Sequence, residues 1–91
     1  MSTHNLQSDQ KKLLRERLIS RSGGEHRLAC LYCEDKLTRE TMTMDHVKPQ
    51  SEGGTWALNN IIVACKPCNE QRGNMNFVDF ILVKNGAVRK T

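Results

Sequence analysis

The apolar positions near the start of the chain recur at helical spacing and predict an amphipathic helix. Leu14 and Leu18 lie four residues apart, so they share one face of that helix. Ser8 belongs to a residue type that caps helix starts, and the glycine pair at 23–24 is typical of a helix end. We therefore expect a first helix that Ser8 caps and that ends near residue 22.

The middle of the chain has a strand pattern. Residues 41–47 alternate and include β-branched side chains, which is typical of a strand. A loop with Pro49 and the glycine pair 53–54 follows, and the short apolar run 61–63 predicts a second strand. The two strands are expected to pair as a hairpin.

Two short helices are expected after the hairpin. The first covers residues 66–72 and ends at Gly73. The second begins after Asn76, which can cap its start, and carries apolar side chains as far as residue 83.

Composition indicates that these elements enclose a thin core. The chain has 91 residues, of which 37% are hydrophobic and 4% aromatic. We therefore expect one small domain whose core is stabilised by an additional cross-link, such as a bound metal or disulfides. No apolar run approaches the roughly 18–20 residues that cross a membrane. Residues 1–5 lack the apolar centre of a secretion signal, so we expect a soluble, cytoplasmic protein.

The net charge of +4 is unevenly distributed along the sequence. Residues 1–21 and residues 84–91 each carry a net charge of +3, whereas residues 22–83 carry −2. The two ends are either solvated segments that favour solubility or basic arms that hold a polyanion such as nucleic acid. Charge alone does not separate these interpretations.

Four cysteines form two pairs of equal spacing, Cys30-x-x-Cys33 and Cys65-x-x-Cys68. Disulfide frameworks suit secreted chains, and a redox CxxC motif usually stands alone, so a metal site is favoured. Four thiolates are a preferred ligand set for a closed, structural zinc site, which would contribute on the order of 10 kcal/mol to folding. An iron site of the rubredoxin type has similar spacing and is the main alternative.

Polar residues and glycines recur at fixed places between and after the cysteine pairs. They form the motifs Asp45-His46-Val47-x-Pro49, Ser51-x-Gly53-Gly54, Asn60-Ile61-Ile62-x-Ala64-Cys65 and Cys68-Asn69-x-x-Arg72-Gly73. In this order and spacing, the motifs and cysteine pairs resemble the HNH endonuclease family over residues 28–74. The resemblance implies a small α+β, ββα-metal (His-Me finger) fold that is stapled by structural zinc and has flanking helices.

The resemblance divides the chain into three parts. Residues 1–26 are the basic N-terminal helix and linker, 27–74 the nuclease core with its zinc knuckles, and 75–91 the C-terminal helix and basic tail.

The resemblance also assigns roles to single residues. The family's first histidine, the general base, falls on His46, and its middle asparagine falls on Asn60, which we expect to bridge the hairpin loop and fix His46. The third position is most often histidine in the family and is Asn69 here, so the chain looks like an HNN variant.

The residue types fit phosphodiester hydrolysis. His46, with an ordinary pKa near about 6.5, can take a proton from water at neutral pH. Asp45 and Asn69 offer oxygen ligands, which favour catalytic Mg²⁺ or Mn²⁺ over zinc. Strand neighbours point to opposite faces, so Asp45 and His46 reach one phosphate only if the strand ends or bulges there. Arg72 follows Asn69 by three residues and shares its helix face, so we expect it to contact a DNA phosphate.

The expected function is therefore a metal-dependent endonuclease that nicks double-stranded DNA with low sequence specificity. Cutting both strands requires a second copy or a protein partner. By resemblance, small free-standing proteins of this kind often belong to phages and other mobile elements. The alternative function is a zinc-stabilised nucleic-acid-binding or adaptor module without cleavage activity.

The remaining histidines and the tryptophan are not expected to take part in the chemistry. His4 and His26 are expected to face solvent. Trp56 is expected to plug the hairpin loop, in preference to stacking on a nucleic-acid base.

Overall fold

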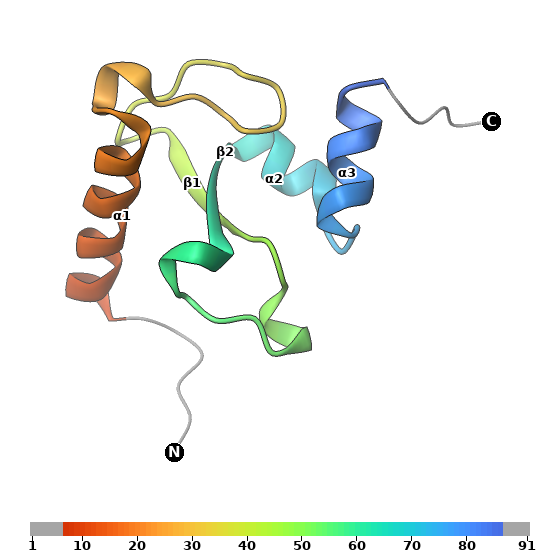
Figure 1. The fold of residues 1–91 in the computed structure, drawn as a ribbon, viewed down its shortest axis with the longest axis horizontal. Coiled ribbons are helices and arrows are strands. Elements are labelled where there is room, and N and C mark those ends of the chain that lie inside the picture. Colours follow the sequence, from red (N-terminus) through yellow and green to blue (C-terminus); the bar gives the residue numbers. More distant parts are fainter. Residues whose placement is uncertain (1–6, 87–91) are drawn as a thin grey trace.

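A two-stranded antiparallel hairpin lies at the centre of the molecule, with helices on both sides of it (Figure 1). The structure is a computed structural model in which residues 7–86 are described. Strand β1 (Met42–His46) pairs with β2 (Ile61–Cys65) in a register that places His46 opposite Ile61. The hairpin confirms the two predicted strands.

Helix α1 (Ser8–Ser22) confirms the predicted first helix, with a shifted start. The N-cap is Gln7, which forms a capping box with Gln10, so Ser8 is already the first helical residue and does not cap it. At the other end, Gly23 has a φ of 100°. Glycine tolerates this left-handed conformation without a steric penalty, and the helix therefore ends where the glycine pair begins.

Helix α1 is part of the core and is anchored to the hairpin. Its apolar stripe is buried, and Leu18 is completely inaccessible to solvent. Arg21, in the last turn, donates hydrogen bonds to the carbonyl oxygens of Leu58 (3.0 Å) and Ile61 (2.9 Å), where the loop enters β2. The basic N-terminal helix is thus a structural element that holds one end of the hairpin.

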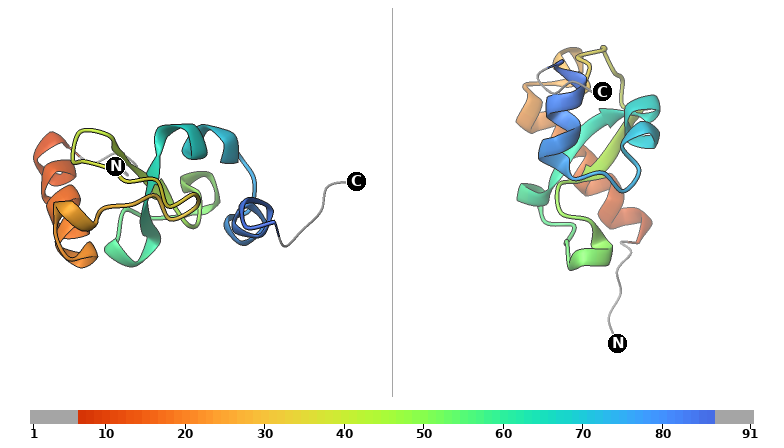
Figure 2. Two further views of the ribbon diagram at one scale, coloured as in Figure 1. Left: turned by 90° about the horizontal axis from the view of Figure 1, so that it is seen from above. Right: turned by 90° about the vertical axis from the view of Figure 1, so that its right-hand side faces the viewer.

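The two remaining helices follow the hairpin as predicted. Helix α2 (Lys66–Arg72) begins directly after β2, and the Cys65 thiol caps it by accepting a hydrogen bond from the backbone N–H of Cys68 (3.4 Å). Helix α3 (Phe77–Lys84) is capped by the Asn76 side chain. Viewed from above, α1 and α3 lie at opposite ends of the molecule with the hairpin between them (Figure 2).

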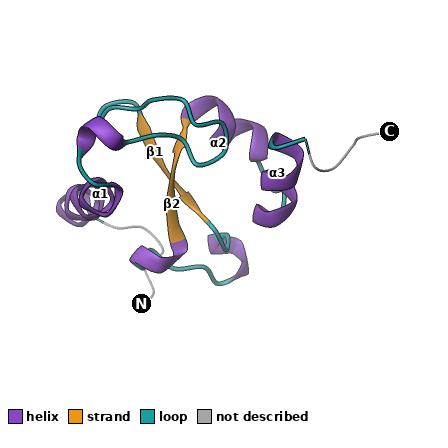
Figure 3. Cartoon of the chain, turned by 45° about the horizontal axis from the view of Figure 1, so that its top comes forward, coloured by secondary structure: helices purple, strands orange, loops and turns teal. Residues whose placement is uncertain are grey.

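The buried core is small and takes residues from α1, both strands, α2 and α3. Figure 3 shows the two strands lying between α1 and α3. Its largest fully buried side chains are Leu18, Leu28, Ile61 and Cys30. Phe80 of α3 reaches this core by packing edge to face on Tyr32, with ring centres 4.7 Å apart. Within residues 7–86, no helix is long and apolar enough to cross a membrane.

The glycine pair in the hairpin loop has a steric cause. Gly53 has a left-handed φ of 91°. A β-carbon on Gly54 would lie only 1.7 Å from the backbone oxygen of Lys48, so the loop closes tightly only with glycine there. This closure brings residues 55–60 back toward the end of β1.

Candidate active site and metal centre

The four cysteine thiols converge on one point, as the sequence predicted. Cys30 and Cys33 lie in a tight turn before β1, whereas Cys65 and Cys68 lie at the junction of β2 and α2. All four sulfur atoms lie within 4.8 Å of one another, and the Sγ atoms of Cys33 and Cys65 are 3.7 Å apart. Four sulfurs bound to a tetrahedral Zn²⁺ at about 2.3 Å are about 3.8 Å apart, so the cluster fits the ion.

The backbone around the cluster favours a thiolate. Burial raises the pKa of the Cys30 thiol, but hydrogen bonds from the backbone N–H groups of Cys65, Cys33 and Tyr32 outweigh burial and lower that pKa to about 7. The turn that carries Cys30 is also fixed to the hairpin, because the N–H of Leu31 donates to the carbonyl oxygen of Val63 (3.0 Å). The cluster therefore joins the turn to the hairpin and to α2.

A second polar centre lies on the hairpin beside α2. It is a hollow of about 200 Å³. Four of the residues singled out in the sequence line it, namely Asp45, His46, Asn69 and Arg72.

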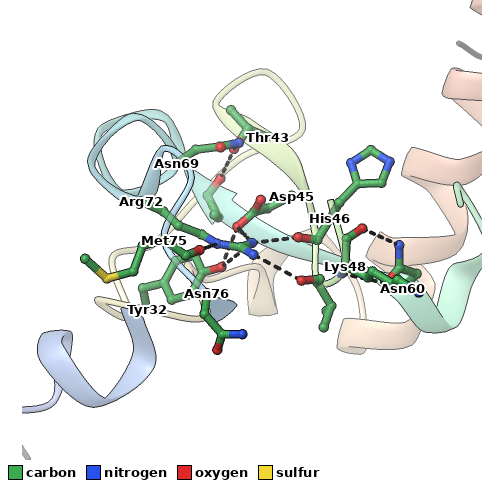
Figure 4. A network of polar contacts seen from close by, with 12 residues as sticks. Tyr32, Thr43, Asp45, His46, Lys48, Asn60, Asn69, Arg72, Met75 and Asn76 are labelled. Carbon is green, nitrogen blue, oxygen red and sulfur yellow. Dashed lines mark hydrogen bonds and ion pairs between the residues drawn. The ribbon is translucent and has the colours of Figure 1, made fainter. Parts of the chain in front are cut away.

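The Asp45 carboxylate is buried and is held by two donors (Figure 4). The hydroxyl of Tyr32 and Nη1 of Arg72 (2.9 Å) both donate to its Oδ2 atom. Burial and the hydrogen bond to Asp45 both raise the pKa of Tyr32, so the phenol stays a donor at neutral pH. Oδ1 accepts no hydrogen bond from the described residues and is available for a cation.

Arg72 differs from the phosphate contact expected from the sequence. Only 4% of it is exposed, and its guanidinium is used inside the protein. Besides its bond to Asp45, it donates to the backbone oxygens of His46 (2.6 Å), Val47 (3.0 Å) and Met75 (2.9 Å). Arg72 therefore fixes the end of β1 and the buried carboxylate together.

Replacing Arg72 with methionine should destabilise the protein strongly, because the buried Asp45 carboxylate loses its charged partner. We expect a decrease of about 3–5 kcal/mol in the free energy of unfolding, measured by urea denaturation. Arg17→Met, at an exposed position of α1, is the matched control and should change it by less than about 0.5 kcal/mol. Equal urea midpoints for Arg72→Met and the wild type would contradict this role.

His46 is the last residue of β1, and the strand ends there without a bulge. Its ring points away from the Asp45 carboxylate (Figure 4) and packs edge to face against Trp56, with ring centres 4.4 Å apart. The Nε2 atom is buried and has no hydrogen-bond partner among the described residues. Burial lowers the pKa of His46, and the nearby Arg72 charge lowers it further against the opposing effect of Asp45, so the imidazole is neutral at neutral pH.

Asn60 lies outside the hollow and ties the hairpin loop together. Its side chain accepts a hydrogen bond from the N–H of Lys48 (2.9 Å) and donates to the carbonyl oxygens of Lys48 (3.1 Å) and Thr55 (2.8 Å). Its backbone oxygen accepts from the N–H of Val47 (2.8 Å). These bonds bridge the loop, and they reach the two residues that follow His46 but not its ring.

The Asn69 amide is oriented by a neighbouring strand residue. Its Nδ2 atom donates to Oγ1 of Thr43 (3.1 Å), and Thr43 in turn donates to the carbonyl oxygen of Ala64 (2.7 Å). Since the amide nitrogen is bound, the amide oxygen of Asn69 is the atom left for a cation in the hollow.

Sequence reasoning missed three residues that organise this site. Tyr32 holds Asp45, Thr43 holds Asn69, and Trp56 packs on His46. No spacing rule marks Tyr32 or Thr43. For Trp56, the signal was a large aromatic residue shortly after the glycine pair of the loop. Both His26 and His4 were predicted to face solvent. His26 is exposed as predicted, and His4 lies outside the described residues.

Comparison with known proteins agrees with this geometry. Residues 30–82 match the HNH endonuclease family. Over 60 residues, the chain is 33% identical to a CRISPR-associated endonuclease Cas9 of Corynebacterium diphtheriae. This match covers 65% of this chain and 5% of that protein. Over 50 residues, the chain is 34% identical to a CRISPR-associated endonuclease Cas9 of Actinomyces naeslundii. This second match covers 54% of this chain and 4% of that protein.

Both matches are confined to a small fraction of a much longer relative, whereas the family match covers more than half of this chain. The hairpin, the helix that follows it and the four clustered cysteines are those of the ββα-metal fold. The chain therefore belongs to the HNH endonuclease family.

Proposed function

We propose that this protein is a metal-dependent endonuclease that hydrolyses phosphodiester bonds in DNA. The observation that carries the proposal is that one hollow is lined by Asp45, His46 and Asn69, which offer a buried carboxylate, an oriented amide and, at the end of β1, a histidine that is neutral at neutral pH. A base for water and two hard oxygen ligands for a divalent ion are the groups that this hydrolysis requires.

In this proposal, His46 takes the proton from the attacking water. Because its Nε2 atom is buried, Nδ1 is the ring nitrogen that we expect to accept the proton. The lowered pKa of the ring keeps it unprotonated before the reaction. Arg72 contributes indirectly, since it holds the backbone oxygen of His46.

The oxygen atoms Oδ1 of Asp45 and Oδ1 of Asn69 are the proposed protein ligands of the catalytic ion. Both are hard ligands, and Mg²⁺ or Mn²⁺ is commonly bound by one or two such groups together with water and phosphate oxygens. When bound, the ion would stabilise the negative charge that develops on the phosphate and on the departing 3′ oxygen.

We assign the four-cysteine cluster to structural zinc. All four ligand positions are sulfur, which leaves no open position for substrate and separates this ion from the chemistry. The DNA phosphate contact, which Arg72 is too buried to make, is assigned to exposed basic residues. Lys48, exposed and two residues after His46, is the first of these.

The test is relaxation of supercoiled plasmid by zinc-loaded protein. With Mg²⁺ or Mn²⁺ we expect conversion to the nicked circle before any linear product, because one site cuts one strand. Omitting the divalent ion should abolish nicking while the zinc stays bound. Salt-sensitive DNA binding with no cleavage under either ion would overturn the proposal and favour the binding-module alternative.

A further inference from the structure

The imidazole of His46 has an aromatic neighbour whose placement is built into the loop. Trp56 lies half-buried in the hairpin loop, and its ring meets that of His46 at 75° with centres 4.4 Å apart. The buried Nε2 atom of His46 has no hydrogen-bond partner in residues 7–86. On that side, ring packing takes the place of the hydrogen bond that would otherwise orient an imidazole.

The tryptophan is itself held from two directions. The Asn60 amide binds the carbonyl oxygen of Thr55, the residue before Trp56. From the other side, the ammonium of Lys11 in α1 lies 5.7 Å from the centre of the Trp56 ring, in the range of a cation–π contact. Arg21 of the same helix fixes the backbone where the loop enters β2.

Helix α1 lies outside the segment that matches the family, residues 30–82. It nonetheless contacts the Trp56 ring through Lys11 and the backbone at the end of the same loop through Arg21. Figure 4 shows the His46 ring pointing away from Asp45, toward the side on which α1 packs. His46, a residue of the matched segment, therefore packs on a tryptophan that a helix outside that segment contacts.

We propose that Trp56, braced by Lys11, is a positioning residue that holds the His46 imidazole in its reactive orientation. The inference rests on the proposed function, because the orientation matters through the proton that His46 accepts. A side chain that turns away from its reactive geometry lowers the rate of the chemical step much more than it weakens substrate binding.

The kinetic test compares Trp56→Leu with Trp56→Phe. Leucine fills part of the space without an aromatic ring, and we expect it to lower kcat for plasmid nicking by about 10- to 100-fold with little change in KM. Phenylalanine keeps the ring contact and should restore kcat to within about threefold of the wild type. Equal rates for the leucine variant and the wild type would overturn the proposal, provided that both proteins bind equal amounts of zinc.

A spectroscopic test does not require activity. Trp56 is the only tryptophan of the chain, so all tryptophan fluorescence comes from this position. His46→Ala should change the emission of the folded, zinc-loaded protein, and Trp56→Leu should shift the imidazole NMR signals of His46. The exposed-site control His26→Ala should leave both unchanged. If the wild type fails to nick DNA but these signals change, the proposed function fails and the contact stands; unchanged signals overturn the positioning role itself.

Discussion

The variant His46→Ala should lose nicking activity almost completely. A positioned general base contributes about 10²- to 10⁴-fold to a rate. Among the described residues that line the hollow with Asp45 and Asn69, no other side chain is a neutral base. We expect the initial rate of plasmid relaxation under Mg²⁺ or Mn²⁺ to fall by that factor. DNA binding should change little, because the ring carries no charge at neutral pH.

His26→Ala is the matched control for this substitution. His26 is exposed and lies before the first cysteine pair, away from the hollow, so its replacement should leave the rate unchanged. Zinc content, measured on all three proteins, tells a lost base from a lost fold. If His46→Ala retains full zinc and nicks as fast as the wild type, His46 is not the base.

Loss of one zinc ligand should unfold the protein. Structural zinc contributes on the order of 10 kcal/mol in zinc-finger peptides, and small domains have total stabilities of about 5–15 kcal/mol. Cys30 is fully buried, in a core whose other large, fully buried side chains are Leu18, Leu28 and Ile61. We therefore expect Cys30→Ser to lose its bound zinc and its helical circular dichroism at 25 °C.

Leu31→Ser provides the comparison, because it changes the next residue of the same turn. Leu31 is 49% exposed and is not one of the four clustered cysteines, so this variant should bind one zinc per chain and stay folded. A zinc chelator should unfold the wild type in the same way as Cys30→Ser does. A Cys30→Ser protein that stays folded without metal, or a coloured, iron-loaded wild type, would contradict the assignment.

Local patterns predicted the elements because their causes are local. The glycine pair 23–24, the cap at Asn76 and the alternation in 41–47 each act within one turn or one strand. The metal cluster could also be predicted, since two equal cysteine spacings restrict the ligand geometry. The start of α1 was misplaced by one residue because Gln7, with Gln10, caps in place of a serine.

The interior of the site could not be predicted in the same way. Arg72 looked like a surface cation on a short helix, and only the packing of α2 on β1 reveals that it is buried against Asp45, 27 positions away. Tyr32 reaches the same carboxylate from the cysteine turn. Such partners are set by how the elements pack, which no pattern within a single segment encodes.

Cys65 ends β2, caps α2 and belongs to the sulfur cluster. One residue thus terminates a ladder, starts a helix and anchors a cross-link, so neither element can fray at the boundary that they share. We therefore expect residues 61–72 to open as a single cooperative unit, with strand and helix amides exchanging together. Asn69 belongs to this unit. We therefore expect the candidate site to stay formed until the whole unit opens, and not to be lost when a short helix frays.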